Sequence, residues 1–477
     1  MIVPLIVLPL SAGVLAFALP HAGLRRGLLI LTSAGHTILV ASCFAVAPEP
    51  LLSGWLGLDA PGLLFLALAS LLFLAASVYG LAYLPREDQR AGHKSERVFV
   101  GCLLLFLSSM TLATTSQHMG LLWISIEATT LSSAPLIYFH RERRSLEATW
   151  KYLLICSVGI ALALMGTFFL AVAVTDGKTV PLVVKDLIEA GGMMHTAWMK
   201  AAFCFLLVGY GTKMGLAPLH TWLPDAHSES PSPVSALLSG ALLNCAFLGI
   251  LRGLQICHGA GLEQFARELL LLFGIFSMGI AAVFLLRPVD FKRMLAYSSV
   301  EHMGILAVGV GLGAAGTSAA LLHAVNHSLA KGMLFLVAGN IVAVYNTKSV
   351  DSVRGLLRRI PASGFLWVSG FLAITGCPPF GTFLSEFSIL RAAADQGLGF
   401  IVAAYLVLLG LAFVGMANAF LHMAQGNSKS SLPGKERYLE LLPPAVLGSG
   451  VLLLGFYIPP HLTSLLETAS RALGGAP

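Results

Sequence analysis

Ionisable side chains inside long apolar segments are the part of this sequence that could do chemistry. Lys213 lies in the segment 200–240, after more than ten mostly apolar residues and directly before an interruption at Gly215 to Pro218. Within a bilayer, a charged side chain and the backbone groups freed by an interrupted helix must face protein or water, so this combination indicates a functional site. A structural lysine whose ammonium extends to the membrane surface is the alternative.

A glutamate earlier in the chain is the expected partner of this lysine. Glu127 lies in GLLWISIEATTLSSAPLIYF, with Ser125, Thr129 and Thr130 around it. A carboxylate among hydroxyls and apolar side chains can pair with a lysine on a neighbouring helix, and opening or closing the pair changes how firmly the lysine holds its proton. A static ion pair that only fixes the packing of two helices is the alternative.

Three titratable residues recur at intervals of four in HAVNHSLAKGMLFLVAGN. His323, His327 and Lys331 therefore share one stripe of a helix, beside Asn326. Neighbours on such a stripe are about 6 Å apart, close enough to exchange a proton through water. Imidazole is suited to this role near physiological pH, although a single histidine of this kind would more often be a core residue.

Further acids and histidines are candidates for the same proton path. Glu386 follows a second interruption in GCPPFGTFLSEFSIL, where the prolines free backbone carbonyls for water or protein donors. Glu301 and His302 adjoin each other in RMLAYSSVEHMGIL; either a relay position or a position near the membrane surface fits them.

The segment HTWLPDAH also carries titratable groups. Its His220, Asp225 and His227 lack a third ligand at close spacing, so the sequence predicts no metal site there. His220 remains a candidate for the step that follows Lys213.

Composition places these residues in an integral membrane protein. The chain has 477 residues, of which 57% are hydrophobic and 11% charged, against about 25% charged in an ordinary soluble domain. Apolar runs of about 20 residues recur throughout, so an all-α fold is expected and not a barrel. The first residues, MIVPLIVLPLSAGVLAFALP, lack the basic start of a signal peptide and predict a first spanning helix.

The cysteines and the net charge exclude other classes. The seven cysteines show no CxxC or other ligand spacing, which argues against an iron–sulfur or zinc site in this chain. Membrane topology accounts for the net charge of +6, so no nucleic-acid partner is expected.

The apolar runs predict the number and orientation of the spanning helices. Loops after odd-numbered helices hold most of the 29 lysine and arginine residues, which places both termini on the outer face of a bacterial-type or archaeal inner membrane. Of the cations inside spans, Arg252 and Arg391 are expected to extend to the membrane surfaces, which leaves Lys151, Lys213 and Lys331 as the informative ones. About 14 helices are predicted, at residues 2–20, 25–47, 62–84, 98–115, 117–139, 149–174, 200–227, 231–256, 268–286, 292–313, 316–345, 361–394, 399–424 and 440–460.

The order of special features repeats along the chain. In both halves a glutamate is followed by a lysine on the next helix and then by an interrupted helix, so helices 4–8 and 9–13 form two five-helix units. An odd number of helices per unit inverts one unit relative to the other, an architecture that transporters use. The predicted domains are an N-terminal three-helix segment, the two repeats, and a C-terminal helix and tail, at residues 1–95, 96–258, 259–425 and 426–477.

These segments, together with GTKMGLAPLHTWLPDAHSESPSPVSALLSG, carry a resemblance to a known family. Over about residues 95 to 425 the chain resembles the antiporter-like membrane subunits of respiratory complex I, Mrp antiporters and group 4 hydrogenases. The SVEHMG and ALLNCAFLGILR segments are most similar to the component F type of hydrogenase-4.

The resemblance implies roles for individual residues. The helix 5 glutamate and helix 7 lysine of the family form a modulating ion pair, which corresponds to Glu127 and Lys213. The titratable residue on the family's broken helix 12 corresponds to Glu386, and its helix 11 positions correspond to His327 and Lys331.

Two departures from the family pattern bear on function. Asn244 stands where complex I relatives of the M and N type carry a helix 8 lysine; an amide can hold water but cannot titrate, so the central transfer is in doubt. The long lateral helix of the L-type subunit is also missing, so the chain is not expected to be that distal subunit.

The resemblance implies a proton-translocating antiporter-like subunit of a membrane-bound multisubunit redox complex, of the group 4 hydrogenase, formate hydrogenlyase or complex I type. Protons would enter from the basic side near helices 7 and 8 and leave near Glu386. The chain would have no redox centre; soluble redox subunits would carry iron–sulfur clusters and, in a hydrogenase, nickel and iron. Other antiporter-like and quinone-oxidoreductase-like membrane subunits would be further partners.

Three alternatives remain open from the sequence. They are a Mrp-like sodium/proton antiporter subunit, a membrane subunit of an inorganic-carbon uptake complex, and an anchoring subunit whose channel does not conduct. The sequence leaves open the electron donor and acceptor, the choice of H⁺ or Na⁺, and the stoichiometry and direction of transport.

Overall fold

The fold is a bundle of long helices, as the sequence predicts. The computed structural model describes residues 1–91, 93–174, 180–426 and 434–474, and these residues form helices and isolated bridges but no sheet. Within this described part, ten helices are long and apolar enough to cross a membrane, and two shorter helices are also apolar. The all-helical membrane fold is therefore confirmed, while the number of 14 spans stays a prediction.

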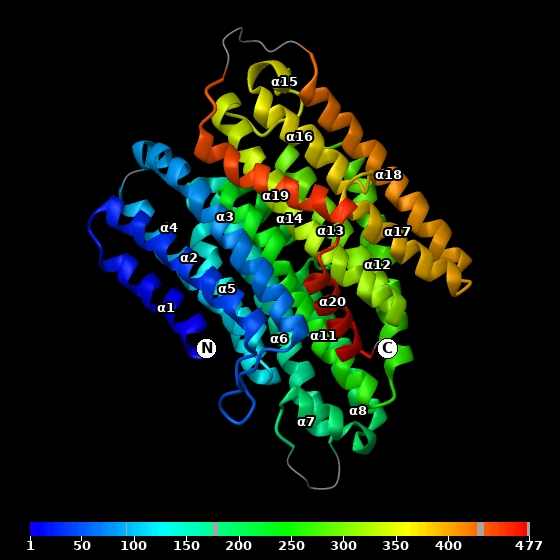
Figure 1. Cartoon of the computed structure of the whole chain (residues 1–477). Helices are drawn as coiled ribbons and strands as arrows, with labels where there is room; N and C mark the ends of the chain where they lie inside the picture. Colours follow the sequence, from blue (N-terminus) through cyan, green and yellow to red (C-terminus); the bar gives the residue numbers. More distant parts are fainter. Residues whose placement is uncertain (92, 175–179, 427–433, 475–477) are drawn as a thin grey trace.

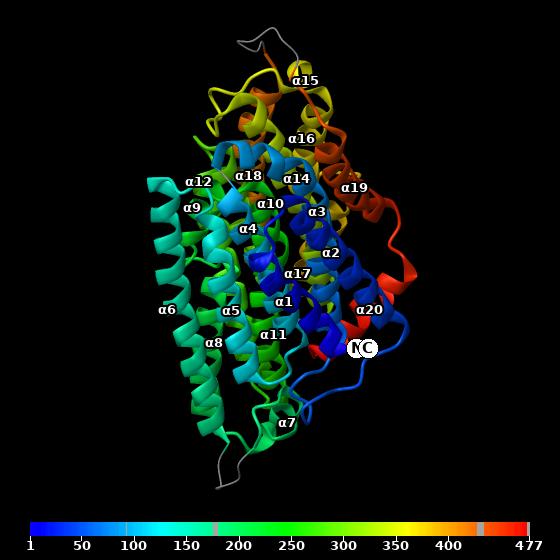
Figure 2. The same ribbon diagram turned by 90° about the vertical axis from the view of Figure 1, so that its left-hand side faces the viewer.

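The helices follow one another with short connections (Figure 1). Both termini lie toward the end that carries α7, away from α15 (Figures 1 and 2). The predicted C-terminal segment, 426–477, begins beside residues 427–433, which lie outside the described part. The elements are α1 (Ile2–Ala18), α2 (Ala22–Ala45), α3 (Ala60–Ala91), α4 (His93–Thr115), α5 (Met119–Ile137), α6 (Arg143–Ala173), α7 (Val184–Glu189), η1 (Gly191–Met193), α8 (Thr196–Met214), α9 (Trp222–Glu229), α10 (Ser232–Leu237), η2 (Leu238–Leu242), α11 (Leu243–Gly259), α12 (Glu263–Leu285), α13 (Phe291–Gly311), α14 (Ala314–Tyr345), α15 (Leu356–Arg359), α16 (Pro361–Ile374), α17 (Gly381–Asp395), α18 (Gly399–Ala424), α19 (Tyr438–Phe456) and α20 (Pro460–Ala472).

Two helices are broken where the sequence predicts it. α8 ends at Met214, its C-cap Gly215 has a φ of +89° in the left-handed region, and the chain resumes as α9. α16 ends at Ile374, Gly376 just after it has a φ of +61°, and α17 starts at Gly381. Glycine is suited to both positions because it lacks the Cβ that makes this conformation costly.

The centre of the bundle is formed by α10, η2, α11 and α14. Every residue in the most apolar window of Ser232–Gly259 is buried, whereas only 22% of the corresponding window in Gly399–Ala424 is buried. α14 packs against α13, α16, α17 and α19, and so it is enclosed on most sides. Polar side chains on α11 and α14 are therefore surrounded by protein.

Several elements were not predicted from the sequence, η1 and α15 among them. The short helix α7 and the amphipathic helix α20 lie outside the predicted spans. The predicted helix 231–256 contains a π-helical turn, η2, immediately before Asn244. Such turns are frequent at functional sites because they rotate the residues on either side of them.

Candidate functional site

The first half of the candidate site surrounds Lys213 in the last turn of α8. The side chain is fully buried, and its Nζ donates hydrogen bonds to Thr130 Oγ1 at 2.8 Å and to Tyr152 Oη at 2.6 Å. The ammonium also lies 4.4 Å from the centre of the Tyr152 ring and 5.8 Å from that of Trp222. Lys213 is thus held by neutral oxygens and aromatic faces.

Glu127 faces the same region from α5. Its Oε1 accepts a hydrogen bond from Ser157 Oγ at 3.2 Å, and its Oε2 has no partner among the described residues. The predicted ion pair with Lys213 is therefore open in this structure, although Glu127 remains within electrostatic range of the lysine. The Lys213 ammonium donates its hydrogen bonds to Thr130 and Tyr152 instead.

Asn244 links the two halves of the bundle. Its Nδ2 donates to the carbonyl oxygen of Gly240 at 2.9 Å and to Ser328 Oγ, on α14, at 2.8 Å. Its Oδ1 is buried and has no partner among the described residues. The amide therefore connects α11 directly to the helix that carries His327 and Lys331.

The second half of the candidate site is a group of three histidines, His302, His323 and His327, all fully or almost fully buried. His302 Nδ1 and His323 Nε2 are 2.8 Å apart, and their rings stack with centroids 4.9 Å apart. The centroids of His302 and His327 are 5.0 Å apart. The stripe predicted on α14 is thus present, and His302 from α13 lies against both of its histidines.

Lys331 ends the stripe on the side away from His323. Its Nζ donates to the carbonyl oxygen of Leu295 at 2.7 Å and contacts Ser298 Oγ. Glu301 is 3% exposed and interacts with Lys331 electrostatically. The structure therefore buries Glu301 inside the protein beside Lys331, and its role in the relay stays a prediction.

The histidines lead to the second helix break. His302 Nε2 lies 2.9 Å from the carbonyl oxygen of Ile374, and His323 Nδ1 lies 3.0 Å from Ser385 Oγ. Glu386 lies beside the break: a Cβ on Gly376 would collide with its carboxylate. Ligand atoms of His302, His323 and Glu386 lie within 4.8 Å of one another and could hold a metal ion, but the two histidines are already hydrogen-bonded to each other.

Several polar atoms along this path have no protein partner among the described residues. Internal water hydrates buried polar groups of this kind, and hydrated groups can exchange protons. The atoms without a partner include Glu127 Oε2, Asn244 Oδ1, Glu301 Oε2, Asn326 Nδ2 and Oδ1, both ring nitrogens of His327, and Glu386 Oε1.

The structure gives the surroundings of three further residues singled out from the sequence. His220 lies in the first break, where its ring contacts Tyr297, and its part in the proton path stays a prediction. Lys151 is 45% exposed and pairs with Glu147 and Asp225. Arg252 is 1% exposed and pairs through both terminal nitrogens with Asp59, just before α3, because a buried guanidinium requires a counter-charge.

The arrangement has a counterpart in known proteins. The family described as "NADH:quinone oxidoreductase/Mrp antiporter, TM" matches residues 116–412, which is more than half of the chain. The chain belongs to this family. The match spans both broken helices, and so both halves of the candidate site lie in the part that defines the NADH:quinone oxidoreductase/Mrp antiporter family.

Relatives in this family include hydrogenase components. The chain is 35% identical over 430 residues to a hydrogenase-4 component F homolog of Methylacidiphilum infernorum, covering 87% of this chain and 88% of the relative. It is 30% identical to hydrogenase-4 component B of Escherichia coli, covering 69% of this chain but only 50% of that longer protein.

Solved structures with the same fold come from multisubunit membrane complexes. A chain of the archaeal membrane-bound sulfane sulfur reductase superposes with a TM-score of 0.88 at 21% identity, over 99% of this chain and 98% of the other. A chain of respiratory complex I from Thermus thermophilus gives a TM-score of 0.79 at 25% identity, over 95% and 96%.

The structure adds residues and contacts that sequence reasoning missed. His302 was a relay candidate from the sequence, but its contact with the α14 stripe was not predicted. Thr130 and Tyr152 hold Lys213, but no spacing rule connects residues on three different helices.

Proposed function

We propose that this chain is a proton-translocating, antiporter-like subunit of a membrane-bound multisubunit redox complex of the group 4 hydrogenase, formate hydrogenlyase or complex I type. The observation that carries the proposal is the row of buried titratable groups that runs from Lys213 through the centre of the bundle to Glu386. Ionisable groups are costly in this position, and so a row of them across a membrane protein supports a transport function.

Lys213 acts as the loading site. When Glu127 pairs with the lysine, the carboxylate stabilises the ammonium. When the pair is open, the neutral oxygens of Thr130 and Tyr152 stabilise the ammonium less than the carboxylate does. Opening the pair therefore favours release of the proton. The conformational change that opens and closes the pair is driven by the partner subunits.

The released proton crosses to the second half near Asn244. The amide does not titrate, so the transfer uses the Ser328 hydroxyl, which Asn244 holds, and internal water. His327 accepts the proton, and the His302–His323 pair carries it to Glu386 beside the second break. Imidazole can accept a proton at one nitrogen and release one from the other, which suits this position.

The redox chemistry belongs to the partners. Soluble subunits carry the iron–sulfur clusters and, in a hydrogenase, the nickel–iron centre, while other antiporter-like and quinone-oxidoreductase-like membrane subunits flank this chain. The complex lies in the cell inner membrane with both termini of this chain on the outer face. The relatives named as hydrogenase components and the basic loops support this placement.

A sodium/proton antiporter subunit is the second candidate. A Staphylococcus aureus Na⁺/H⁺ antiporter subunit A1 is 30% identical over 87% of this chain, which spans 54% of that protein. Glu301 and Glu386 lie within electrostatic range of each other, and carboxylates are the oxygen ligands that a hard cation prefers. Sodium-dependent proton movement in vesicles would favour this candidate.

The test uses the assembled complex in sealed vesicles with hydrogen or formate as the electron donor. Lys213→Ala and Glu127→Ala should abolish proton movement while leaving part of the redox turnover intact. Lys151→Ala is the matched control, because this lysine is 45% exposed and lies outside the row. Wild-type proton movement in both Lys213→Ala and Glu127→Ala would overturn the proposal.

A further inference from the structure

Two imidazoles and one carboxylate converge at the second helix break. His302 of α13, His323 of α14 and Glu386 of α17 each offer one ligand atom, and these atoms lie within 4.8 Å of one another. The two histidines are at most 1% exposed, and Glu386 is 6% exposed. Two imidazoles with one carboxylate are a donor set that zinc ions accept.

The outer nitrogens of both imidazoles are held by oxygen atoms. His302 Nε2 lies 2.9 Å from the carbonyl oxygen of Ile374, which can only accept, so this nitrogen carries the hydrogen. His323 Nδ1 lies 3.0 Å from Ser385 Oγ, and that hydroxyl donates to the carbonyl oxygen of Thr382 at 2.9 Å. The lone pairs of the hydroxyl then accept from His323 Nδ1, so both outer nitrogens are donors.

The inner nitrogens, His302 Nδ1 and His323 Nε2, face each other 2.8 Å apart. A neutral imidazole carries one hydrogen, so each inner nitrogen presents a lone pair when the outer nitrogen holds that hydrogen. Two lone pairs at this distance require a positive charge between them, which is either a shared proton or a metal ion. A metal ion thus replaces the proton in the bond between the two imidazoles.

The contacts of the outer nitrogens also match those of metal-binding histidines. Such histidines almost always donate their other N–H to an oxygen atom, which fixes the tautomer and the orientation of the ring. The carbonyl of Ile374 and the hydroxyl of Ser385 provide this support. Two nitrogens bound to one tetrahedral zinc ion are about 3.3 Å apart, so the pair opens by about 0.5 Å from 2.8 Å.

Glu386 supplies a third ligand and a counter-charge. Its Oε1 is buried and has no partner among the described residues, although buried polar atoms nearly always have one. Glu301 lies within electrostatic range of Glu386, and its Oε2 also has no partner in the described part of the chain. Buried charges are paired or coordinate metals, and two carboxylates can balance a divalent cation.

The break gives this group its exposed side. Gly376 and Cys377 are half-buried and Pro378 is exposed, whereas His302 and His323 are enclosed by helices. A Cβ on Gly376 would collide with Oε2 of Glu386. An ion that enters at the break therefore reaches this carboxylate.

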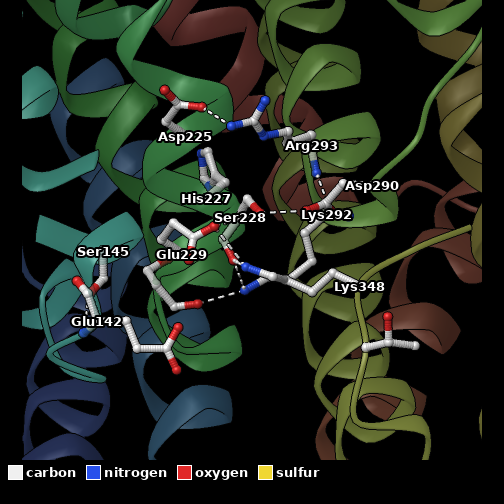
Figure 3. Close-up of polar contacts among 12 residues, drawn as sticks. Glu142, Ser145, Asp225, His227, Ser228, Glu229, Asp290, Lys292, Arg293 and Lys348 are labelled. Carbon is white, nitrogen blue, oxygen red and sulfur yellow. Dashed lines mark hydrogen bonds and ion pairs between the residues drawn. The ribbon is translucent and has the colours of Figure 1, made fainter. Parts of the chain in front are cut away.

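A second cluster of charged side chains, at the end of α9 and the start of α13, lacks these features (Figure 3). Glu229 pairs with Lys348 at 2.8 Å, and Asp290 Oδ2 accepts from Ser228 Oγ at 2.6 Å. These carboxylates are already bonded to a cation or a hydroxyl. The cluster therefore offers a control for the group at the second break.

We propose that His302, His323 and Glu386 form a binding site for a divalent transition-metal ion such as Zn²⁺, and that the bound ion stops proton transfer through the second half of the path. The ion takes the inner lone pairs of both imidazoles and one oxygen of Glu386, and the proton shared by the imidazoles leaves to water. Binding of the ion is independent of the proposed function, whereas the block of proton transfer rests on it.

The first experiment titrates the full chain in detergent micelles with Zn²⁺. His302→Gln, His323→Gln and Glu386→Gln should each raise the dissociation constant of Zn²⁺ by at least about 100-fold, because a lost ligand costs more than a lost supporting group. Ser385→Ala removes such a supporting group and should raise it about tenfold. Unchanged affinity in any of the three ligand variants would overturn the site.

Two matched controls accompany this titration. His36→Gln replaces another fully buried imidazole, whose ring nitrogens are bonded to Ser70 at 2.9 Å and Thr111 at 3.0 Å. Glu229→Gln replaces a carboxylate that is bonded to Lys348. Both controls should bind Zn²⁺ like the parent chain. An equal loss of affinity in the controls would overturn the site, because the loss would not be specific to the group.

A second measurement does not depend on how buried variants fold. Zinc-edge X-ray absorption of the parent chain, loaded with one Zn²⁺ per chain, should show two imidazole nitrogens at about 2.0–2.1 Å and carboxylate oxygen at about 2.0–2.2 Å. A coordination shell without two imidazoles, or one that contains sulfur, would overturn the site.

The block is tested with the assembled complex in sealed vesicles, using hydrogen or formate as donor and a pH-sensitive dye. Zn²⁺ should lower the protons moved per electron pair, and Ser385→Ala should require about tenfold more Zn²⁺ for the same relative loss. Equal zinc sensitivity, or no loss in the parent at saturating Zn²⁺, would overturn the block. Wild-type proton movement in Lys213→Ala without zinc would overturn the proposed function but not the zinc site, which the micelle titration decides.

Discussion

The two broken helices hold sites of different character. At the first break a single buried ammonium, Lys213, is held by hydroxyls, and its potential counter-charge Glu127 is bonded elsewhere. At the second break His302 and His323 are bonded to each other and lead toward Glu386, and a third imidazole, His327, packs against His302. The first region therefore centres on one ammonium that could pair or separate from a carboxylate, whereas the second is a group of neighbouring imidazoles, two of them joined by a hydrogen bond. The difference suits the proposed function, in which the two regions perform successive steps of one process.

The largest loss of proton movement is expected from replacing His323 at the second break. His323→Gln can still hydrogen-bond to Ser385 but cannot titrate, so proton movement per redox turnover should fall by about 10²-fold or more. The dye assay in vesicles measures this ratio. His195→Gln, which replaces an exposed histidine at the start of α8, is the control and should behave as wild type.

A smaller loss of proton movement is expected at the first break, where Tyr152 bonds to Lys213. Tyr152→Phe removes one of the two hydrogen bonds of Lys213 and leaves the other, to Thr130, in place. Leaving a buried donor unsatisfied costs about 1–3 kcal/mol, so proton movement should slow by about tenfold. Tyr210→Phe serves as the control, because the hydroxyl of this buried tyrosine has no partner among the described residues. Equal rates of proton movement for both variants would show that the Tyr152 hydroxyl does not take part in it.

A still smaller loss of proton movement is expected at Asn244, which connects the two regions. Asn244→Leu breaks the hydrogen bond to Ser328 without removing a titratable group. Because one neutral hydrogen bond contributes about 1 kcal/mol, proton movement should fall about fivefold. Asn244→Gln, which keeps the amide, should recover part of the loss. An unchanged rate for Asn244→Leu would mean that protons cross elsewhere.

The smallest effect on transport is expected at Asp59, which lies just before α3 and outside both regions. Burial works to raise the pKa of Asp59, but the charge and hydrogen bonds of Arg252 outweigh it, and so the pKa lies below its ordinary value. Asp59→Asn should lower the free energy of unfolding by about 1–3 kcal/mol at neutral pH, less than for a fully buried pair, and leave proton movement unchanged.

The pH dependence of this stability has a definite sign. A depressed folded-state pKa stabilises the protein above the ordinary aspartate pKa, and this stability is lost as pH falls through the depressed value. The difference in melting temperature between Asp59→Asn and the parent should therefore persist at pH 5–8 and shrink only below about pH 4. A difference that disappears already at pH 6 would contradict the assignment.

The sequence predicted the elements better than the contacts between them. Apolar runs and interrupted segments were enough to predict the helical fold, both breaks and the stripe on α14, because these depend on local periodicity and on glycine and proline. Two contacts depend on tertiary packing instead: that of His302 with this stripe, and the hydrogen bond between Tyr152 and Lys213. The burial of Arg252 was missed because its partner Asp59 lies 193 residues away.

The central claim is that the two broken-helix regions act in series, and a double variant tests it most directly. Protons moved per electron pair are compared for Lys213→Met, His323→Gln and the combination of both. Steps in series predict that the double variant is no worse than the more damaging single variant, since one blocked step already stops the path. Losses that multiply in the double variant would contradict the account, because they would show that the two regions act independently.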